Sequence, residues 1–234
     1  MSIKDSASFS RWAIDKRKLY GNLKKLDIAN TLEELYKKAT EFFFADEEAN
    51  SFKLRRNTDL HPTIKKEHLW ERIITMCMPK ACFYNQFSFN RTNNIDLVQT
   101  DANGAICRLF ELKTGSNELA HAAYEIIFYY ALMLRARREE LLPAELAKPV
   151  TLTIVAPNYY CKNKSHYRFM DEIQKNLSDN PYYEKALISF LPLPFSSRRE
   201  EFEENTRKLR RKIIGGTIAS DNLKSFEEYF LKNL

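Results

Sequence analysis

The sequence contains little of what marks fibrous, disordered or membrane-spanning chains. Glycine occurs 5 times in 234 residues, and no stretch combines low hydrophobicity with charge of a single sign. A chain of this composition has enough apolar side chains to bury an interior, so it is expected to fold. No run of about 18 or more apolar residues is present, and the N-terminal segment lacks the continuous apolar stretch of a secretory signal. We therefore expect a globular, cytoplasmic protein that does not enter a membrane.

Metal sites built from thiolates or imidazoles are not indicated either. The 4 cysteines include no C-x-x-C pair; they are Cys77, Cys82, Cys107 and Cys161. Because the ligands of zinc and iron–sulfur sites cluster, we expect reduced thiols, the first three packed among apolar neighbours. The 4 histidines show no mutual metal spacing; they are His61, His68, His121 and His166. A catalytic site based on histidine is therefore not expected.

A modest positive charge permits a polyanionic partner without requiring one. Lys and Arg total 37 against 31 Asp and Glu, which gives a formal net charge of +6. The length suits one domain of ordinary size with helical additions. We predict a core over residues 61–195, preceded by a helical extension over residues 1–60 and followed by a helical tail over residues 196–234.

Hydrophobic periodicity predicts a coarse element order of αβββαβαβ and then the helical tail. Apolar residues recur at helical spacing after Thr31, a candidate N-cap with Glu34 at the capping-box position. A second helix follows Thr63 and ends before Pro79. The remaining predicted elements are strands over residues 83–89, 95–99, 106–112, 150–155 and 186–191, helices over residues 117–142 and 165–177, and helices after residue 197 that are interrupted at Gly215 and Gly216.

Two of these strands are expected to form a hairpin. The turn over residues 101–104 contains Asn103 and Gly104, which tolerate the positive φ values that tight turns need. The helix that follows, over residues 117–142, contains neither glycine nor proline and is apolar on most sides. We therefore expect it to be buried.

Charged residues of the hairpin form the candidate catalytic set. Side chains two apart in a strand point the same way, so Glu111 and Lys113 share a face while Leu112 points into the core. If Asp96 faces that side from the neighbouring strand, two carboxylates and an ammonium converge near the backbone carbonyl of Leu112. Hard cations such as Mg²⁺ bind carboxylate oxygens and stabilise charge on a phosphoryl oxygen, and Lys113 would polarise the attacking water. An exposed, salt-bridged hairpin face is the structural alternative.

The segments NNIDLV and RLFELKTG, in this element order, resemble the PD-(D/E)XK nuclease superfamily, which has the restriction-endonuclease-like fold. The resemblance covers about residues 63–156, and Ile95 stands where the family name has proline. It implies an α/β fold with an αβββαβ core, a mixed sheet flanked by helices, here with extra N- and C-terminal helices. It also implies that Asp96, Glu111 and Lys113 act with Mg²⁺ or Mn²⁺.

The resemblance further implies an acidic metal ligand on the helix before the first strand. Glu67 and Glu71 lie one turn apart there and border its apolar stripe, so either can reach the metal directly or through water. For each of them a solvated helix glutamate is the alternative. Some exonuclease-like branches carry Gln and Tyr four apart on the helix after E-x-K, where this chain has Glu125 and Tyr129. The chain departs from those branches, and its helix tyrosines are expected to pack rather than to catalyse.

A nucleic-acid-binding loop is predicted after the fourth strand. Tyr159 and Tyr160 offer rings that stack on bases, and Lys162, Lys164 and Arg168 offer cations for phosphates. Other cationic clusters have plainer explanations, at a helix end or on a solvated face; they are Arg135, Arg137 and Arg138, and the tail cations from Arg198 to Lys212.

Two functions of different classes follow. The first is metal-dependent hydrolysis of phosphodiester bonds by a nuclease, with DNA as the preferred substrate, in defence, repair or processing of foreign DNA. The second is a non-catalytic nucleic-acid-binding or assembly protein that keeps the nuclease fold and offers its long apolar helix to a partner. The presence of Asp96, Glu111 and Lys113 together favours the first. Cleavage of both strands of a duplex by one small site would suggest a homodimer.

Overall fold

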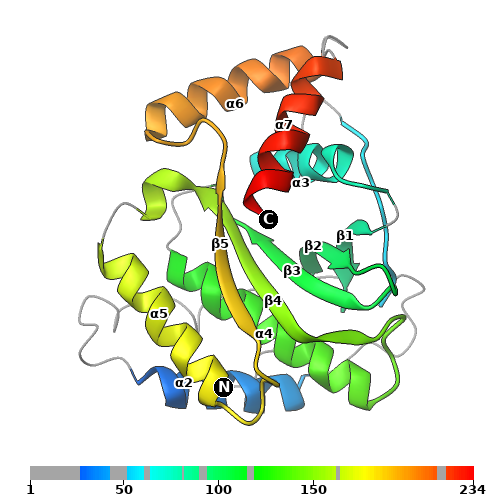
Figure 1. Ribbon diagram of the computed structural model, residues 1–234, viewed down its shortest axis with the longest axis vertical. Coiled ribbons are helices and arrows are strands. Elements are labelled where there is room, and N and C mark those ends of the chain that lie inside the picture. The colour runs from blue at the N-terminus through cyan, green and yellow to red at the C-terminus, as the bar shows by residue number, and fades with distance from the viewer. Residues whose placement is uncertain are drawn as a thin grey trace.

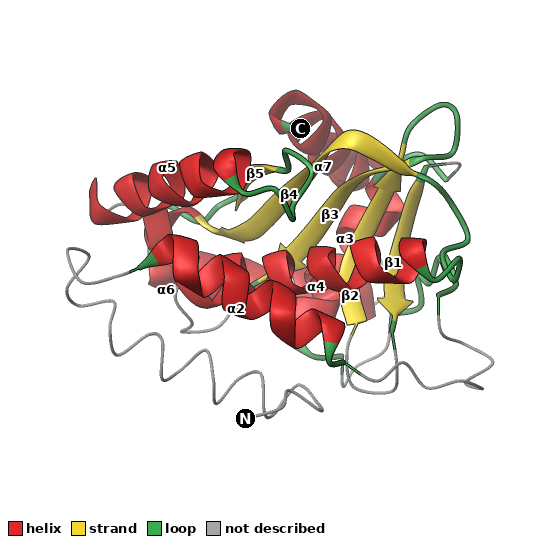
Figure 2. Cartoon of the chain, turned by 90° about the horizontal axis from the view of Figure 1, so that it is seen from below, coloured by secondary structure: helices red, strands yellow, loops and turns green. Residues whose placement is uncertain are grey.

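A five-stranded mixed sheet flanked by helices gives the chain an α/β fold. The computed structural model describes residues 27–42, 52–60, 64–80, 82–89, 94–114, 119–161, 164–214 and 220–234. The α-helices are α2 (Ile28–Thr40), α3 (Lys66–Cys77), α4 (Leu119–Arg138), α5 (Lys164–Asp179), α6 (Arg199–Ile214) and α7 (Ser220–Asn233), and η2 (Asn158–Cys161) is a 3-10 helix. The strands are β1 (Phe83–Ser88), β2 (Asn94–Thr100), β3 (Ile106–Leu112), β4 (Leu146–Pro157) and β5 (Leu187–Leu193). Figure 2 shows them as one continuous sheet among the helices.

The sheet changes from antiparallel to parallel pairing at β3. Its strand order is β1-β2-β3-β4-β5; β1, β2 and β3 pair antiparallel, and β3, β4 and β5 pair parallel. The predicted β2–β3 hairpin is confirmed. Its turn is closed by Asp101, whose Oδ1 accepts from the amides of Asn103 at 2.8 Å and Ala105 at 2.9 Å, and Gly104 adopts a φ of 82°. The parallel pairs need longer crossovers, which run through α4 and α5.

The three parallel strands end at one side of the sheet, which we call the carboxyl edge. Leu112, Val155 and Leu191 lie side by side there, close to the ends of β3, β4 and β5. The chain leaves this edge through Lys113, through η2 and through the turn before α6 (Figure 1). Ligands of open α/β sheets bind outside the carboxyl ends of the strands, so a functional site is expected at this edge.

Two apolar layers cover the two faces of the sheet. Successive residues Leu109 and Phe110 of β3 enter different layers, as side-chain alternation requires. The first layer contains α2, α4 and α5, and α4 is buried on most sides, as predicted. The second contains α3, α6 and α7, where Trp70 stacks on Phe202 with ring centroids 5.8 Å apart. In Figure 1 the helices of the second layer gather in the upper part and those of the first in the lower part.

The predicted order of elements is confirmed, but the first two helices do not begin where the sequence pattern predicts. α2 begins before Thr31 because Asp27 is its N-cap and accepts from the amide of Asn30 at 2.9 Å. Thr31 is buried within the helix, where its hydroxyl donates to the Asp27 carbonyl at 2.8 Å. α3 begins at Lys66, and the predicted cap Thr63 lies outside the described residues.

The fourth strand is longer than the pattern predicted. β4 begins at Leu146, because Leu146 already pairs with Ile106 of β3. The pairing shifts register between Ile106 and Arg108, so the strand continues past an irregularity before it reaches the core. The exposed Lys148 and Pro149 near its start hide this part of the strand from a hydrophobic pattern.

The described parts of the predicted flanking segments pack on the central core. α2 contacts α4 and α5, and residues 52–60 run beside β1, where the Asn85 amide donates to the Arg55 carbonyl at 2.7 Å. α7 contacts α3, and its Phe226 and Phe230 complete the second apolar layer. The tail helices therefore share an interior with the sheet.

Two further sequence expectations concern the membrane and the thiols. Within the described ranges, no helix has the length and apolarity that crossing a membrane requires. The thiols described as free are those of Cys77, Cys82 and Cys107. Burial raises the pKa of the Cys77 thiol to about 12, so this thiol packs in its neutral form.

Candidate functional site

Two carboxylates face each other across the β2–β3 hairpin. Leu97 pairs with Phe110, and one further step of this antiparallel register sets Asp96 opposite Glu111. The amide N–H of Leu112 donates to Oδ2 of Asp96 at 2.7 Å, so the Asp96 side chain caps the end of β3. The negative charge of Asp96 also raises the pKa of Glu111, as expected for carboxyl groups on paired strand positions.

Lys113 joins this pair from the first position after β3. Its amide donates to the Val155 carbonyl at 2.9 Å, which ties it to β4. Its Nζ lies 2.5 Å from Oε1 of Glu111 and 2.9 Å from Oε2 of Glu125 on α4. Burial lowers the pKa of Lys113, but the charges of Glu111, Glu125 and Asp96 outweigh this effect and raise it well above the usual value. Lys113 is therefore protonated at neutral pH, and two carboxylates fix the position of its ammonium group.

The surroundings of Glu111 disfavour its ionised form. The residue is 3% exposed, and its pKa is raised well above the usual value by burial first and then by the charge of Glu125. The ammonium of Lys113 offsets part of this rise. The Oε2 atom of Glu111 has no hydrogen-bond partner among the described residues. A buried acid in this condition is one that a further cation would stabilise.

Asp96 is also held partly in its neutral form. Burial, and then the charges of Glu71 and Glu67, raise its pKa to about 7, although Lys113 and the Leu112 amide favour the ionised form. Burial is thus the main reason that Asp96 titrates near neutrality, and the two neighbouring acids add to it.

The two acids of α3 reach the same place. Glu71 is 1% exposed, and its Oε1 accepts from Nδ2 of Asn85 at 2.8 Å, while its Oε2 lies 2.8 Å from Nδ1 of His68. Glu67 accepts from the amide of Thr114 at 3.3 Å through Oε1. Both α3 acids act on the pKa of Asp96, so neither is a remote solvated residue.

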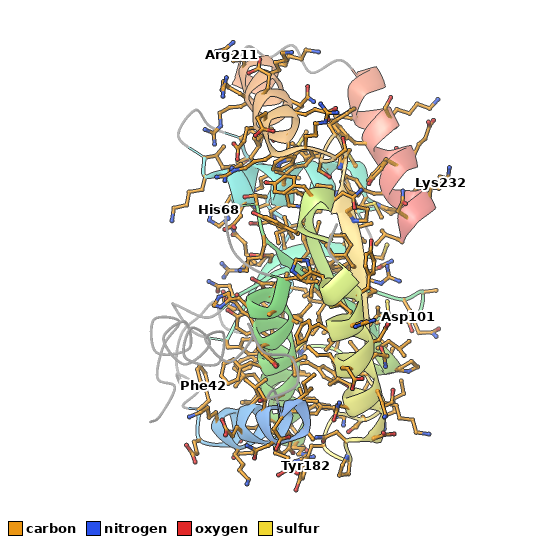
Figure 3. All side chains as sticks on the ribbon, turned by 90° about the vertical axis from the view of Figure 1, so that its left-hand side faces the viewer. Phe42, His68, Asp101, Tyr182, Arg211 and Lys232 are labelled. Carbon is orange, nitrogen blue, oxygen red and sulfur yellow. The ribbon has the colours of Figure 1, made fainter. Side chains whose placement is uncertain are left out.

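Cations of α3 stand beside these acids. The guanidinium of Arg72 lies 3.7 Å from Oε1 of Glu71. The hydrogen bond to Glu71 raises the pKa of His68, although burial opposes this. A cavity of ≈ 470 Å³ opens at this place, lined by His68 and Arg72 together with Lys65 and Gln86. Figure 3 labels His68 in the upper half of the molecule, on the side of α3.

Glu125 and Tyr129 on α4 were noted in the sequence but were not assigned to the site. Tyr129 donates to Oε1 of Glu125 at 3.2 Å, and His121 lies 3.4 Å from Oε2 of the same residue. These residues follow one another at steps of four, which places them on one face of the helix and was a usable signal. Asn85 was missed as well, although a polar residue between Phe83 and Phe87 at a buried strand position is an anomaly that the sequence displays.

The predicted nucleic-acid loop has a different structure from the one expected. Tyr159 and Tyr160 form part of the 3-10 helix η2, with ring centroids 4.7 Å apart, and both hydroxyl oxygens are buried. Their rings pack against the second and the first apolar layer respectively, which limits their faces for stacking. Arg168 is exposed on α5; Lys162 and the side chain of Lys164 lie outside what the structure describes.

The arginines at the end of α4 do not belong to the site. Arg135 pairs with Glu139 at 2.6 Å, Arg137 pairs with Glu184, and Arg138 donates to the Tyr36 hydroxyl. At about 1.5 Å per helical residue, they lie roughly 15–20 Å along α4 from Glu125. Their role is to anchor α4 to its neighbours.

The charges gathered at the carboxyl edge come from four elements. The acidic members are Glu67, Glu71, Asp96, Glu111 and Glu125, and the cationic partners are Lys113 and Arg72. Over the described ranges, no three His, Cys, Asp or Glu side chains already form a metal-binding group. Most of their oxygens instead face donors of the chain, such as Lys113, Asn85 and the Leu112 amide. The donor chemistry nevertheless fits a hard cation, because it consists of carboxylates, two of which, Asp96 and Glu111, have a raised pKa, and it includes the unpartnered Oε2 of Glu111.

A scan against models of protein families, a search of curated proteins and a search of solved structures each found no match. The residues at the carboxyl edge are therefore what indicates a function for this chain.

Proposed function

We propose that this chain is a metal-dependent nuclease of the PD-(D/E)XK type, with the restriction-endonuclease-like fold, which hydrolyses phosphodiester bonds in nucleic acid and preferably in DNA. The observation that carries the proposal is the meeting of Asp96, Glu111 and Lys113 at the ends of two adjacent strands. An exposed hairpin face does not account for it, because Glu111 is buried and Asp96 caps a strand end.

The ligands of the proposed Mg²⁺ or Mn²⁺ are Asp96, Glu111 and the backbone carbonyl of Leu112. Glu67 or Glu71 completes the set, since both influence Asp96. When bound, the cation would stabilise negative charge that develops on a phosphoryl oxygen. The buried, unpartnered Oε2 of Glu111 supports this assignment, because a cation would offset the cost of burying its negative charge.

Lys113 has a separate role in the proposed reaction. Its raised pKa keeps it protonated at neutral pH, so it acts as a hydrogen-bond donor and a positive charge rather than as a base. It can hold the attacking water and offset the charge of the transition state, a contribution that usually amounts to about a hundredfold or more in rate. Glu111 and Glu125 fix its position from two elements.

The cations beside the site suit a polyanionic substrate. Lys65, His68 and Arg72 line the cavity next to Glu71 together with one acid, Asp59, and the chain carries a net charge of +6. Phosphate groups bind such positions mainly through charge. Defence, repair or processing of foreign DNA is the setting we infer, with two copies acting together where both strands of a duplex are cut.

The experiment compares wild type with Asp96→Asn, Glu111→Gln and Lys113→Ala on linear duplex DNA, with Mg²⁺ and with Mn²⁺. Each variant should cut at least about a hundredfold more slowly. Lys148→Ala is the matched control: Lys148 lies near the start of β4, and its side chain is 70% exposed. It should cut at the wild-type rate, and thermal unfolding should confirm that all four variants fold.

Two outcomes would overturn the proposal. Equal cleavage by wild type and by Lys113→Ala would place the activity elsewhere. Tight DNA binding by wild type without cleavage under either metal would instead favour a non-catalytic nucleic-acid-binding protein that retains the fold.

A further inference from the structure

A second pocket opens at the carboxyl edge, beyond the end of β5. It has a volume of ≈ 770 Å³ and lies between the turn after β5, helix α6 and helix α7; we call it the α6–α7 pocket. Its walls include Trp70, Phe195, Phe226 and Tyr229, which are aromatic. None of these residues belongs to the proposed catalytic set.

The pocket lies close to the candidate catalytic residues. Leu112, Val155 and Leu191 stand side by side in adjacent strands, and strands are about 4.8 Å apart, so the ends of β3 and β5 are separated by roughly 10 Å. Asn158, the first residue after β4, lines the pocket between these two ends. Figure 3 labels Arg211 of α6 in the same half of the molecule as His68, whereas Tyr182 lies at the other end. A strand of nucleic acid leaving the catalytic residues can therefore reach the pocket within a few nucleotides.

Phe195 is presented to solvent by a turn that is firmly held. Its side chain is 57% exposed, and its φ is 55°, a left-handed conformation that bulky residues rarely adopt. The neighbouring Ser196 fixes the turn: its Oγ accepts from the Asn158 amide at 2.8 Å and donates to the Leu193 carbonyl. Its own carbonyl accepts from the Tyr159 amide at 3.0 Å. An apolar ring held outward in a strained backbone is the kind of feature that a ligand contact explains.

The charges around the pocket have one sign. The charged residues that line it among those described are Lys208, Arg211 and Lys212 of α6, and all three are cations. Lys208 lies 3.8 Å from Glu204, which itself does not line the pocket. In addition, the indole N–H of Trp70 is buried and has no hydrogen-bond partner among the described residues. The pocket thus combines flat apolar walls with a cationic rim.

We propose that the α6–α7 pocket binds a nucleotide unit, with its base against Phe195 and its phosphate at the cations of α6. A planar, apolar body that carries negative charge matches both properties of the pocket, and base–aromatic stacking with phosphate neutralisation is the usual chemistry of single-strand binding. The inference rests on the proposed function for the source of the nucleotide, which is a strand of the substrate. A free nucleotide has the same chemistry and is the other source to be tested.

The test measures binding of a fluorescein-labelled oligo(dT) by anisotropy, in EDTA, so that no cleavage contributes. Phe195→Ala should weaken binding about tenfold. Arg211→Glu should weaken binding further and lower the slope of log affinity against log salt concentration by about one. The controls are Leu187→Ala, an exposed apolar residue at the opposite end of β5, and Arg207→Glu, an exposed arginine of α6 that does not line the pocket. Leu187→Ala should bind as tightly as wild type. Arg207→Glu should lose no more affinity than its change in net charge explains.

Competition with unlabelled dTMP distinguishes the two sources. Displacement of the oligonucleotide at micromolar dTMP, lost in Phe195→Ala, would identify a free-nucleotide site rather than a strand contact. Wild-type affinity in Phe195→Ala and Arg211→Glu would overturn the proposal, as would losses no larger than those of the controls. Phe195-dependent capture of an acidic peptide, with oligonucleotide binding unchanged, would also overturn it.

Binding and cleavage measured separately distinguish this inference from the proposed function, because the pocket contains none of the proposed catalytic residues. If wild type binds through Phe195 but never cleaves DNA, the pocket stands and the nuclease proposal fails. If wild type cleaves DNA and Phe195→Ala binds normally, the nuclease proposal stands and the pocket fails.

Discussion

Lys113 and Glu125 form an ion pair across the space between the end of β3 and helix α4, with 2.9 Å between Nζ and Oε2. Glu125 is itself held by Tyr129, which donates to its Oε1 at 3.2 Å, and lies 3.4 Å from His121. Burial favours the neutral form of Glu125, but Lys113 and His121 outweigh it and lower the pKa of the carboxyl group. The position of the ammonium therefore depends on a helix as well as on its own strand.

Replacement of Glu125 by Gln should slow cleavage and narrow its pH range. The substitution removes one of the charges that raise the pKa of Lys113, so the lysine would lose its proton at a lower pH. We expect Glu125→Gln to cleave about tenfold more slowly than wild type at pH 8, and its rate relative to wild type to fall further towards pH 10. Steady-state cleavage rates from pH 7 to pH 10 provide the measurement.

The control for this substitution is Glu139→Gln, at the first residue after the same helix. Glu139 pairs with Arg135 at 2.6 Å, and its side chain is 41% exposed, so its loss should leave the pH profile unchanged. Profiles of Glu125→Gln and wild type that coincide over the whole range would show that Glu125 does not act on Lys113.

The affinity for Mn²⁺ should rise with pH through neutrality. The pKa of Asp96 is raised to about 7, so below this pH a proton must leave before the carboxylate can act as a ligand. Each unit of pH between 7 and 5.5 should therefore weaken binding by about tenfold. Isothermal titration with Mn²⁺ at pH 5.5, 6.5 and 7.5 measures this. Asp96→Asn should bind more weakly and with a shallower pH dependence; an affinity of wild type that does not change with pH would contradict the prediction.

The parts of this site that are local in sequence are the parts that the sequence predicts. Asp96 and Glu111 lie in one hairpin, whose turn carries its own signal at Gly104, and strand alternation then fixes which way their side chains point. Glu125 and Asn85 belong to a helix and a strand whose position depends on packing of the whole sheet. No local pattern predicts that these two residues lie next to the hairpin acids, although each is recognisable as a polar residue in an apolar stretch.

Asn85→Ala should destabilise the protein. The buried amide of Asn85 donates to the Asn57 carbonyl at 2.8 Å and to Glu71 at 2.8 Å, and accepts from the Asn57 amide at 2.7 Å. Its removal leaves buried groups unpaired at a cost of about 2–3 kcal/mol. For a chain of this size the melting temperature should fall by roughly 4–12 °C. Asn176→Ala is the control, since Asn176 makes a single exposed bond to the Glu172 carbonyl; equal losses in the two variants would refute the special role of Asn85.

Glu184→Gln should lower stability at neutral pH and lose this effect in acid. The hydrogen bond from Arg137 first, and then the charges of Arg137 and Lys148, lower the pKa of Glu184. A carboxylate whose pKa is lowered on folding contributes stability above its unfolded value of about 4.3, and this contribution disappears as the pH falls through the folded value. The Arg137–Glu184 pair is partly exposed, with side-chain exposures of 23% and 26%, so we expect a contribution of about 0.5–1 kcal/mol. Differential scanning calorimetry should find Glu184→Gln melting about 1–4 °C below wild type at pH 7, with the gap closing towards pH 3. A gap that stays constant over this range would mean that the substitution acts through packing of the turn and not through charge.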